Sequence, residues 1–80
     1  MKQIHSFKSS SYKTLWVNDK DEHFIVSTID TAFGQETMIF NSDNEGKVTD
    51  YQDLFVVFSK NSHVAIVDQF VAFLEIKNGT

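Results

Sequence analysis

The chain lacks cysteine, proline and arginine, and it has only three glycines in 80 residues. Without cysteine there is neither a disulfide nor a thiolate metal site, so we expect an intracellular setting. Arginine is the preferred bidentate partner of phosphate and guanine, and its absence argues against direct nucleic-acid binding. The three glycines are also too scattered to form a phosphate-binding loop.

Long apolar runs are missing as well. No stretch approaches the ~20 apolar residues of a membrane span, and the N-terminal region has no apolar run of the signal-peptide kind. We therefore expect no membrane association and a cytoplasmic location. Residues 1–18 carry three lysines and no acid, whereas the remainder carries four lysines against all eleven acidic residues. Such an acidic remainder repels nucleic acid rather than gathering it.

Aromatic residues are abundant: eight Phe, two Tyr and one Trp. We expect one small domain, residues 1–80, and a domain of this size is marginally stable unless large side chains or dimerisation compensate. Tyr12, Trp16, Phe33 and Tyr51 fall in an early strand or near turns. They are either recruited into the core or serve as interface anchors, for which Trp and Tyr are enriched.

Residues 62–77, SHVAIVDQFVAFLEIK, predict the only helix. Their apolar side is much broader than the stripe of an ordinary surface helix. The helix therefore needs a sheet across it, and contact at one flank as well. Its predicted core residues are Val67, Phe70, Val71 and Leu74.

Alternating or β-branched segments at residues 12–17, 23–30, 35–40 and 54–58 predict strands joined by short connections. We predict an α+β fold, a three- to four-stranded antiparallel β-meander with one C-terminal helix packed on one face. Residues 1–11 are either a partly ordered arm or a segment in which Ile4 and Phe7 seat one helical turn or an edge strand. The run at 54–58, LFVVF, is either a central strand or an edge strand also used by a partner. The predicted sheet core is Phe24, Val26, Met38, Phe40, Phe55 and Val57.

Residues that could carry chemistry are few. Residues 41–52 overlay the calcium-loop pattern in part, but Gln52 at the last position cannot supply a bidentate carboxylate. We interpret this stretch as an acidic loop between strands. His63 faces the apolar side of the helix and is expected to cover the end of the core or to bond a nearby carbonyl, with a titrating switch or a metal ligand as the alternative. No nucleophile signature is present, so we predict no enzyme activity, no cofactor and no metal.

Three short motifs follow one another between Phe24 and Leu54. They are Phe24-x-Val26-Ser27-Thr28, then Glu36-Thr37-Met38-Ile39-Phe40, then Gly46-x-Val48-x-Asp50-Tyr51-x-Asp53-Leu54. This succession resembles a group of small proteins encoded by phages and prophages of Gram-positive bacteria. Members of that group continue with a charged strand and a helix carrying a Gly-His pair, whereas this chain continues with LFVVF and has no Gly-His. The resemblance implies a mobile-element accessory protein that acts inside a bacterial cell.

The function predicted from these features is a small non-enzymatic protein-binding module that inhibits or modulates a host or competing mobile-element protein. The alternative is a self-associating structural or assembly component, with a homodimer closed by symmetric pairing. The candidate binding surfaces are the acidic loops and the exposed edge of the LFVVF strand. The candidate partner-binding residues are Trp16, Asp43, Glu45, Asp50, Tyr51 and Asp53.

Overall fold

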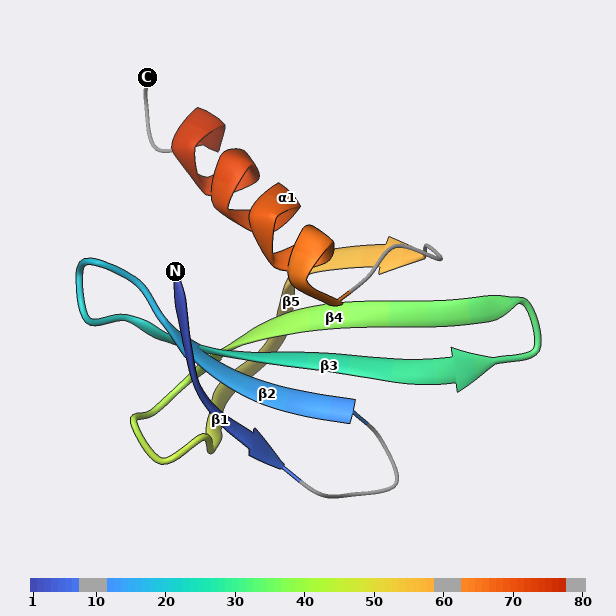
Figure 1. Ribbon diagram of the computed structural model, residues 1–80, viewed down its shortest axis with the longest axis horizontal. Helices are drawn as coiled ribbons and strands as arrows, with labels where there is room; N and C mark the ends of the chain where they lie inside the picture. The colour runs from blue at the N-terminus through green and yellow to red at the C-terminus, as the bar shows by residue number, and fades with distance from the viewer. Residues whose placement is uncertain (8–11, 59–62, 78–80) are drawn as a thin grey trace.

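The computed structural model describes residues 1–7, 12–58 and 63–77. It contains one antiparallel sheet whose strands follow chain order, with a helix lying over one face (Figure 1). The elements are β1 (Lys2–Phe7), β2 (Tyr12–Val17), β3 (His23–Thr31), β4 (Gly34–Ser42), β5 (Val48–Phe58) and α1 (His63–Lys77). The α+β class and the C-terminal helix are therefore confirmed.

The predicted number of strands is wrong, because the sheet has five. The additional strand is β1, which pairs with β2 at one side of the sheet. Its sequence alternates weakly, so its strand form depends on pairing with its neighbour rather than on its own pattern. Residues 8–11 of the expected arm lie outside the described residues, as does Ser62 at the expected helix start.

A tight connection sets the register between β3 and β4. At the β3–β4 hairpin, Thr31 pairs with Gly34, leaving Ala32 and Phe33 as the two-residue loop. The φ of Gly34 is 128°, a conformation that favours glycine. The Thr31 hydroxyl donates to the Gly34 carbonyl at 2.8 Å and accepts from the Phe33 N–H at 3.2 Å, and both bonds close the loop.

The core lies between α1 and the facing side of the sheet. Phe70 is fully buried there, and its ring centroid lies 5.3 Å from that of Phe24 and 5.7 Å from that of Phe55. Edge-to-face and tilted contacts of this kind stabilise aromatic pairs beyond their burial alone. The buried core cluster consists of Trp16, Phe24, Val26, Ile39, Val67 and Phe70. The sheet thus buries Ile66, Val67 and Phe70 of the broad apolar side of the helix, whereas Val64 remains 57 % exposed.

The predicted core face of β4 is wrong. Met38 and Phe40 are predicted to lie under the helix, but the buried residues of β4 that face it are Thr37 and Ile39. Ile39 pairs across β3 with Val26, and therefore it shares the helix-facing side. Both sides of β4 carry large apolar residues, so alternation alone does not identify the core side.

The second face of the sheet has a smaller buried cluster of its own. Leu15 and Ile25, which pair across β2 and β3, are buried on the side away from the helix. Phe7 reaches this side against Gly46, where a Cβ would come within 2.5 Å of the Phe7 ring. Gly46 also has a φ of 89°, so this turn favours glycine for its backbone and for its close packing.

Candidate partner-binding edge

The candidate site is the outer strand of the sheet, β5, together with the turn that leads into it. Asp50, Tyr51 and Asp53 all lie in β5 and are exposed. Asp43 and Glu45 lie in the preceding turn, between β4 and β5. These five predicted residues therefore fall on one continuous segment, which is the edge strand and its approach.

β5 has an open edge. It pairs with β4 along one side, and on its other side it pairs with no strand in the part of the chain that the structure describes. The interpretation of LFVVF as an edge strand therefore holds over that of a central strand. An edge strand presents unpaired backbone N–H and C=O groups, to which another strand can bind.

β5 is strongly bent in its middle. Three steps along β4, from Ile39 to Ser42, correspond to seven steps along β5, from Phe55 to Val48. The surplus residues of β5 bulge out of the ladder, and bulges of this kind bend a strand. Figure 1 shows the change of direction between the yellow and the orange parts of β5. The bulge displays Tyr51, whose side chain is 81 % exposed.

The last part of β5 is regular and uncharged. Residues 55–58 pair one to one with Glu36–Ile39 of β4. Phe55 packs beneath α1, whereas Val56 and Phe58 remain 47 % and 55 % exposed. Natural sheet edges are commonly protected by charges, bulges or proline. In β5 the aspartates and the bulge lie before residue 55, so the regular segment lacks that protection.

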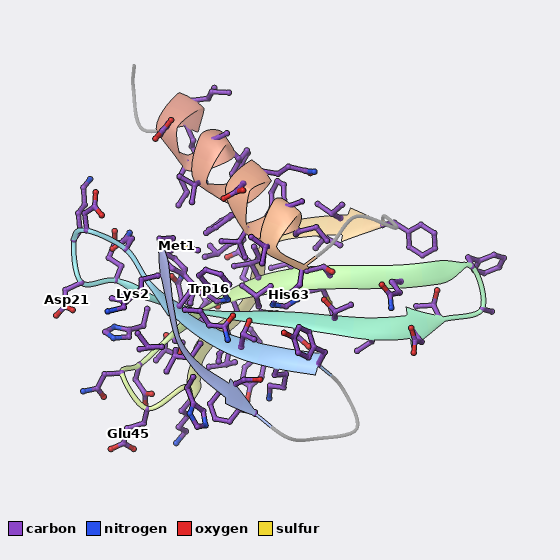
Figure 2. All side chains as sticks on the ribbon, viewed as in Figure 1. Met1, Lys2, Trp16, Asp21, Glu45 and His63 are labelled. Atoms are coloured by element: carbon purple, nitrogen blue, oxygen red, sulfur yellow. The ribbon has the colours of Figure 1, made fainter. Side chains whose placement is uncertain are left out.

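Asp43 has a structural role in the turn. Its Oδ1 accepts hydrogen bonds from the backbone N–H groups of Glu45 and Lys47, both at 2.9 Å. These bonds favour the charged form and lower the pKa of the Asp43 carboxyl from its ordinary value. Glu45, by contrast, is exposed at the tip of the turn, where Figure 2 shows it pointing away from the sheet. Of these two predicted residues, Glu45 is the one with a carboxylate that the turn itself does not use.

Asp50 also organises its own backbone, since its Oδ1 accepts from the N–H of Gln52 at 2.9 Å. Among the described residues there is no group of three or more His, Cys, Asp or Glu arranged to hold a metal ion. Glu45, Asp50 and Asp53 are exposed and give this part of the molecule a negatively charged surface. These acids lie at the start of β5 or in the turn before it, and the later part of β5, residues 55–58, is apolar.

Trp16, the remaining predicted residue, lies in the core. It is 6 % exposed, and its indole N–H donates to the Thr14 hydroxyl at 2.7 Å. Of the four aromatic residues considered as core recruits or anchors, Trp16 is the one recruited into the core. Tyr12, Phe33 and Tyr51 are exposed.

A polar network beneath the first turn of α1 was missed from the sequence. The ring nitrogens of His63 both hydrogen-bond to sheet hydroxyls, Nε2 to Thr14 and Nδ1 to Thr28 at 3.1 Å. Thr28 bonds onward to Thr37 at 2.8 Å. Figure 2 places His63 beside Trp16 below the helix. The expectation that His63 covers the end of the core is met, but its partners are hydroxyls of residues far away in sequence.

Burial governs the charge state of this histidine. Desolvation lowers the pKa of His63 below its ordinary value of 6.5. A neutral ring has one donor and one acceptor nitrogen, so the chain of bonds from Trp16 through Thr14 and His63 to Thr28 can run in one direction. A protonated ring would donate from both nitrogens and leave the Thr14 hydroxyl, which is fully buried, without that acceptor.

No protein-family model, curated protein or solved structure matches this chain. The resemblance to phage and prophage proteins therefore stays a prediction from the motifs between Phe24 and Leu54. Among the described residues, no helix combines the length and the apolar character that crossing a membrane requires.

Proposed function

We propose that this chain is a small non-enzymatic protein-binding module that captures an extended segment of a partner on the open edge of β5. The observation that carries the proposal is the regular, uncharged segment at residues 55–58, which is open on one side. Adding a strand to such an edge satisfies backbone hydrogen bonds on both chains, while side chains on alternate positions supply specificity.

The side chains around this edge define the partner segment. Val56 and Phe58 are about half exposed and favour apolar residues opposite them. Asp50 and Asp53 precede them, and β5 contains no lysine or arginine. The exposed carboxylates of Asp50 and Asp53 attract positive charge, so basic residues are favoured near them in the partner. The partner segment is therefore apolar at one end and basic at the other.

The resemblance to phage and prophage proteins supports a biological setting for this module. We propose that it acts in the cytoplasm of a bacterial host and binds a host or competing mobile-element protein, which it inhibits or redirects. A segment of the partner that binds to the edge of β5 can no longer make its usual contacts within the partner. This loss of contacts would inhibit the partner directly.

Affinity capture from a Gram-positive cell lysate tests the proposal when two matched variants are compared. Val56→Lys places a charge on the edge, whereas Val64→Lys places the same charge on an exposed position of α1. We expect one stoichiometric partner that is retained by the Val64 variant and lost with the Val56 variant. A partner retained equally by both variants would show that the β5 edge is not the binding surface.

Two further measurements separate the charged contribution from self-association. Replacing Asp50 and Asp53 by Asn should weaken capture moderately and reduce its salt dependence, because exposed charge pairs are screened. Asp43 is left unchanged in this variant, since its carboxylate accepts the two hydrogen bonds that hold the turn. Light scattering without any partner tests the alternative. A dimer that dissociates in the Val56 variant alone would establish self-association through β5 in place of a foreign partner.

A further inference from the structure

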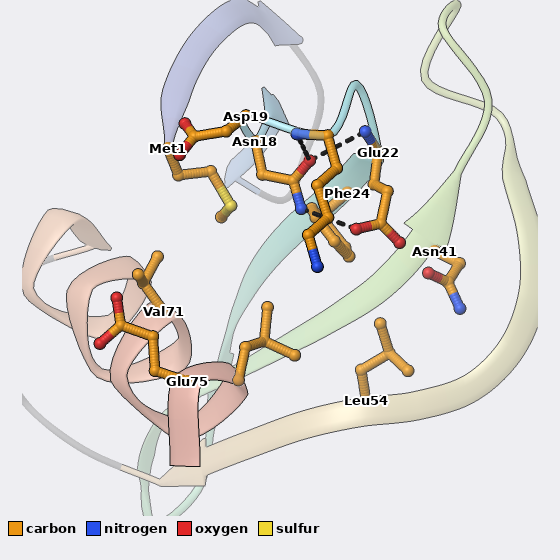
Figure 3. A pocket seen from close by; sticks show the side chains of 11 residues that line it. Met1, Asn18, Asp19, Glu22, Phe24, Asn41, Leu54, Val71 and Glu75 are labelled. Carbon is orange, nitrogen blue, oxygen red and sulfur yellow. Dashed lines mark hydrogen bonds between the residues drawn. The ribbon is translucent and has the colours of Figure 1, made fainter. Parts of the chain in front are cut away.

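A cleft of about 540 Å³ lies where the C-terminal half of α1 parts from the sheet (Figure 3). Its lining is apolar at the base, with Phe24 from β3, Leu54 from β5, and Val71 and Leu74 from α1. The volume lies within the ~300–1,000 Å³ that is common for small-molecule sites. Four side chains from three separate elements thus form an apolar base of a size that suits a small ligand.

The β2–β3 turn forms one wall of the cleft and is held by its own hydrogen bonds. Asn18 Oδ1 accepts from the N–H of Lys20 at 3.0 Å and from the N–H of Glu22 at 2.9 Å. Its amide group donates to Glu22 Oε1 at 3.0 Å (Figure 3). The Glu22 carboxylate is therefore positioned at this wall before any ligand arrives.

The charges around the cleft are predominantly negative. Asp19, Glu22 and Glu75 line it with three carboxylates, against the two amines of Lys20 and of the Met1 terminus. Asp19, Lys20 and Glu22 are exposed, so a ligand charge placed near them keeps contact with water. An apolar body on the base and a cation beside this wall would therefore match the two kinds of surface at once.

We propose that the cleft is a binding site for a small organic cation, an apolar body of phenyl or short alkyl size that carries one ammonium group. The apolar body packs on Phe24, Leu54 and Val71, while the ammonium lies near Asp19 and Glu22. The equivalent carboxylate would meet like charges there and is disfavoured. This site is separate from the open edge of β5, so neither proposal depends on the other.

A titration with three probes of the same body tests the proposal: phenethylamine, phenethyl alcohol and hydrocinnamate. Binding is followed by amide proton–nitrogen correlation NMR at neutral pH and low salt. We expect the amine to bind about 10-fold more tightly than the carboxylate, with the alcohol between them and the difference shrinking at high salt. The saturating shifts should centre on Phe24, Leu54, Val71 and Leu74.

Charge variants on the exposed wall should change the affinity for the amine in opposite directions. Glu22→Gln keeps an oxygen for Asn18 to bond and should weaken amine binding about 2- to 4-fold, whereas Lys20→Gln should strengthen it by a similar factor. Glu45→Gln removes a carboxylate from the β4–β5 turn, away from the cleft lining, and should leave amine affinity unchanged. Hydrocinnamate should respond to the Glu22 and Lys20 variants in the opposite sense.

A matched pair of helix variants tests the apolar part. Val71→Phe fills the cleft and should abolish saturable shifts with all three probes, whereas Val64→Phe adds the same bulk at an exposed position outside it. Equal affinity for the three probes would overturn the assignment of a cation site. Shifts centred away from the cleft, or no saturable binding by any probe, would overturn the site itself. The charge variants decide the matter even if the Val71 variant does not fold.

Discussion

The two ends of the helix–sheet interface are built differently. At the N-terminal end of α1, His63 hydrogen-bonds through both ring nitrogens to Thr14 and Thr28 of the sheet. At the C-terminal end, Val71 and Leu74 are only partly buried and line the cleft. One end is therefore held by directional polar bonds, and the other rests on partial apolar contact.

The difference shows how one short helix can be fixed on the sheet at its N-terminal end and still leave a cleft at its C-terminal end. A buried polar network is costly when incomplete, so its satisfied form specifies one position of the helix end. In the described part of the chain, no buried side-chain nitrogen or oxygen lacks a partner. Because the hydrogen bonds at the N-terminal end fix the position of the helix on the sheet, the C-terminal end can diverge from the sheet while the helix stays in place. Four sets of variants test this comparison.

The largest effect is expected at Phe70, which lies in the core between the two ends. Phe70→Ala removes a fully buried ring that contacts Phe24 and Phe55, and should lower the free energy of unfolding by about 3–5 kcal/mol. Urea denaturation followed by circular dichroism measures this change. A loss below about 1 kcal/mol would mean that the interface is not the main core.

The polar end should be the next most sensitive. Thr14→Val conserves shape but leaves both the Trp16 indole N–H and one His63 nitrogen without their partner. We expect a loss of about 2–3 kcal/mol, because each unsatisfied buried group costs roughly 1–3 kcal/mol. Thr49→Val, at an exposed position of β5, is the control and should change the unfolding free energy by less than about 0.5 kcal/mol. Equal losses in both variants would contradict a specific role for the network.

A pair of equal truncations compares the two ends directly. Val67 is buried in the core cluster, whereas Val71, one turn later, is only partly buried at the cleft. We expect Val67→Ala to cost about 2 kcal/mol and Val71→Ala less than about 1 kcal/mol, since the effect follows buried apolar area. Thermal or urea unfolding of both variants measures the difference. A larger loss of unfolding free energy at Val71 would show that the C-terminal end of the helix packs tightly on the sheet.

The smallest effect is the pH dependence of His63. Its pKa is lowered in the folded state, so the unfolded chain takes up protons first as the pH falls below about 6.5. The stabilising contribution is complete above the unfolded pKa, declines as the pH falls toward the folded pKa, and is constant below it. We expect less than about 1 kcal/mol, because the ring is only partly buried.

NMR titration of the three histidine rings measures the folded pKa of His63 directly. His63→Phe should remove this part of the pH dependence, and it should also lower stability at high pH, because Thr14 and Thr28 lose their partner. A titration midpoint of His63 above 6.5 would contradict a pKa lowered by burial.

Much of the architecture could be predicted from periodicity and turn residues. The helix at residues 63–77, the strands that begin at Tyr12 and His23, and the hairpin at Gly34 follow local pattern. For β1 the sequence left an edge segment as one of several alternatives, because its alternation is weak and its pairing with β2 decides its form. The face of β4 could not be chosen either, since Ile39 on one side and Phe40 on the other are both large and apolar.

The candidate edge was predicted in part. Asp50, Tyr51 and Asp53 are exposed on β5, in keeping with their expected place on a surface. Trp16 lies in the core, because its cross-strand neighbour Phe24 and the helix above enclose it. Asp43 bonds to its own turn. The bulge that displays Tyr51 arises from unequal lengths of β4 and β5 between paired residues, which no local motif records.

The amino-acid sequence by itself determined the class of fold, the position of the helix and the surplus of apolar surface on that helix, because these depend on spacing within one segment. The tertiary structure alone decided the buried side of β4, the open edge at β5, the His63 network and the cleft. Each of these joins residues that are far apart in the chain. Thr14 and His63 meet only because strand order and helix placement bring them together. Local periodicity describes spacing within one segment and cannot predict such a contact.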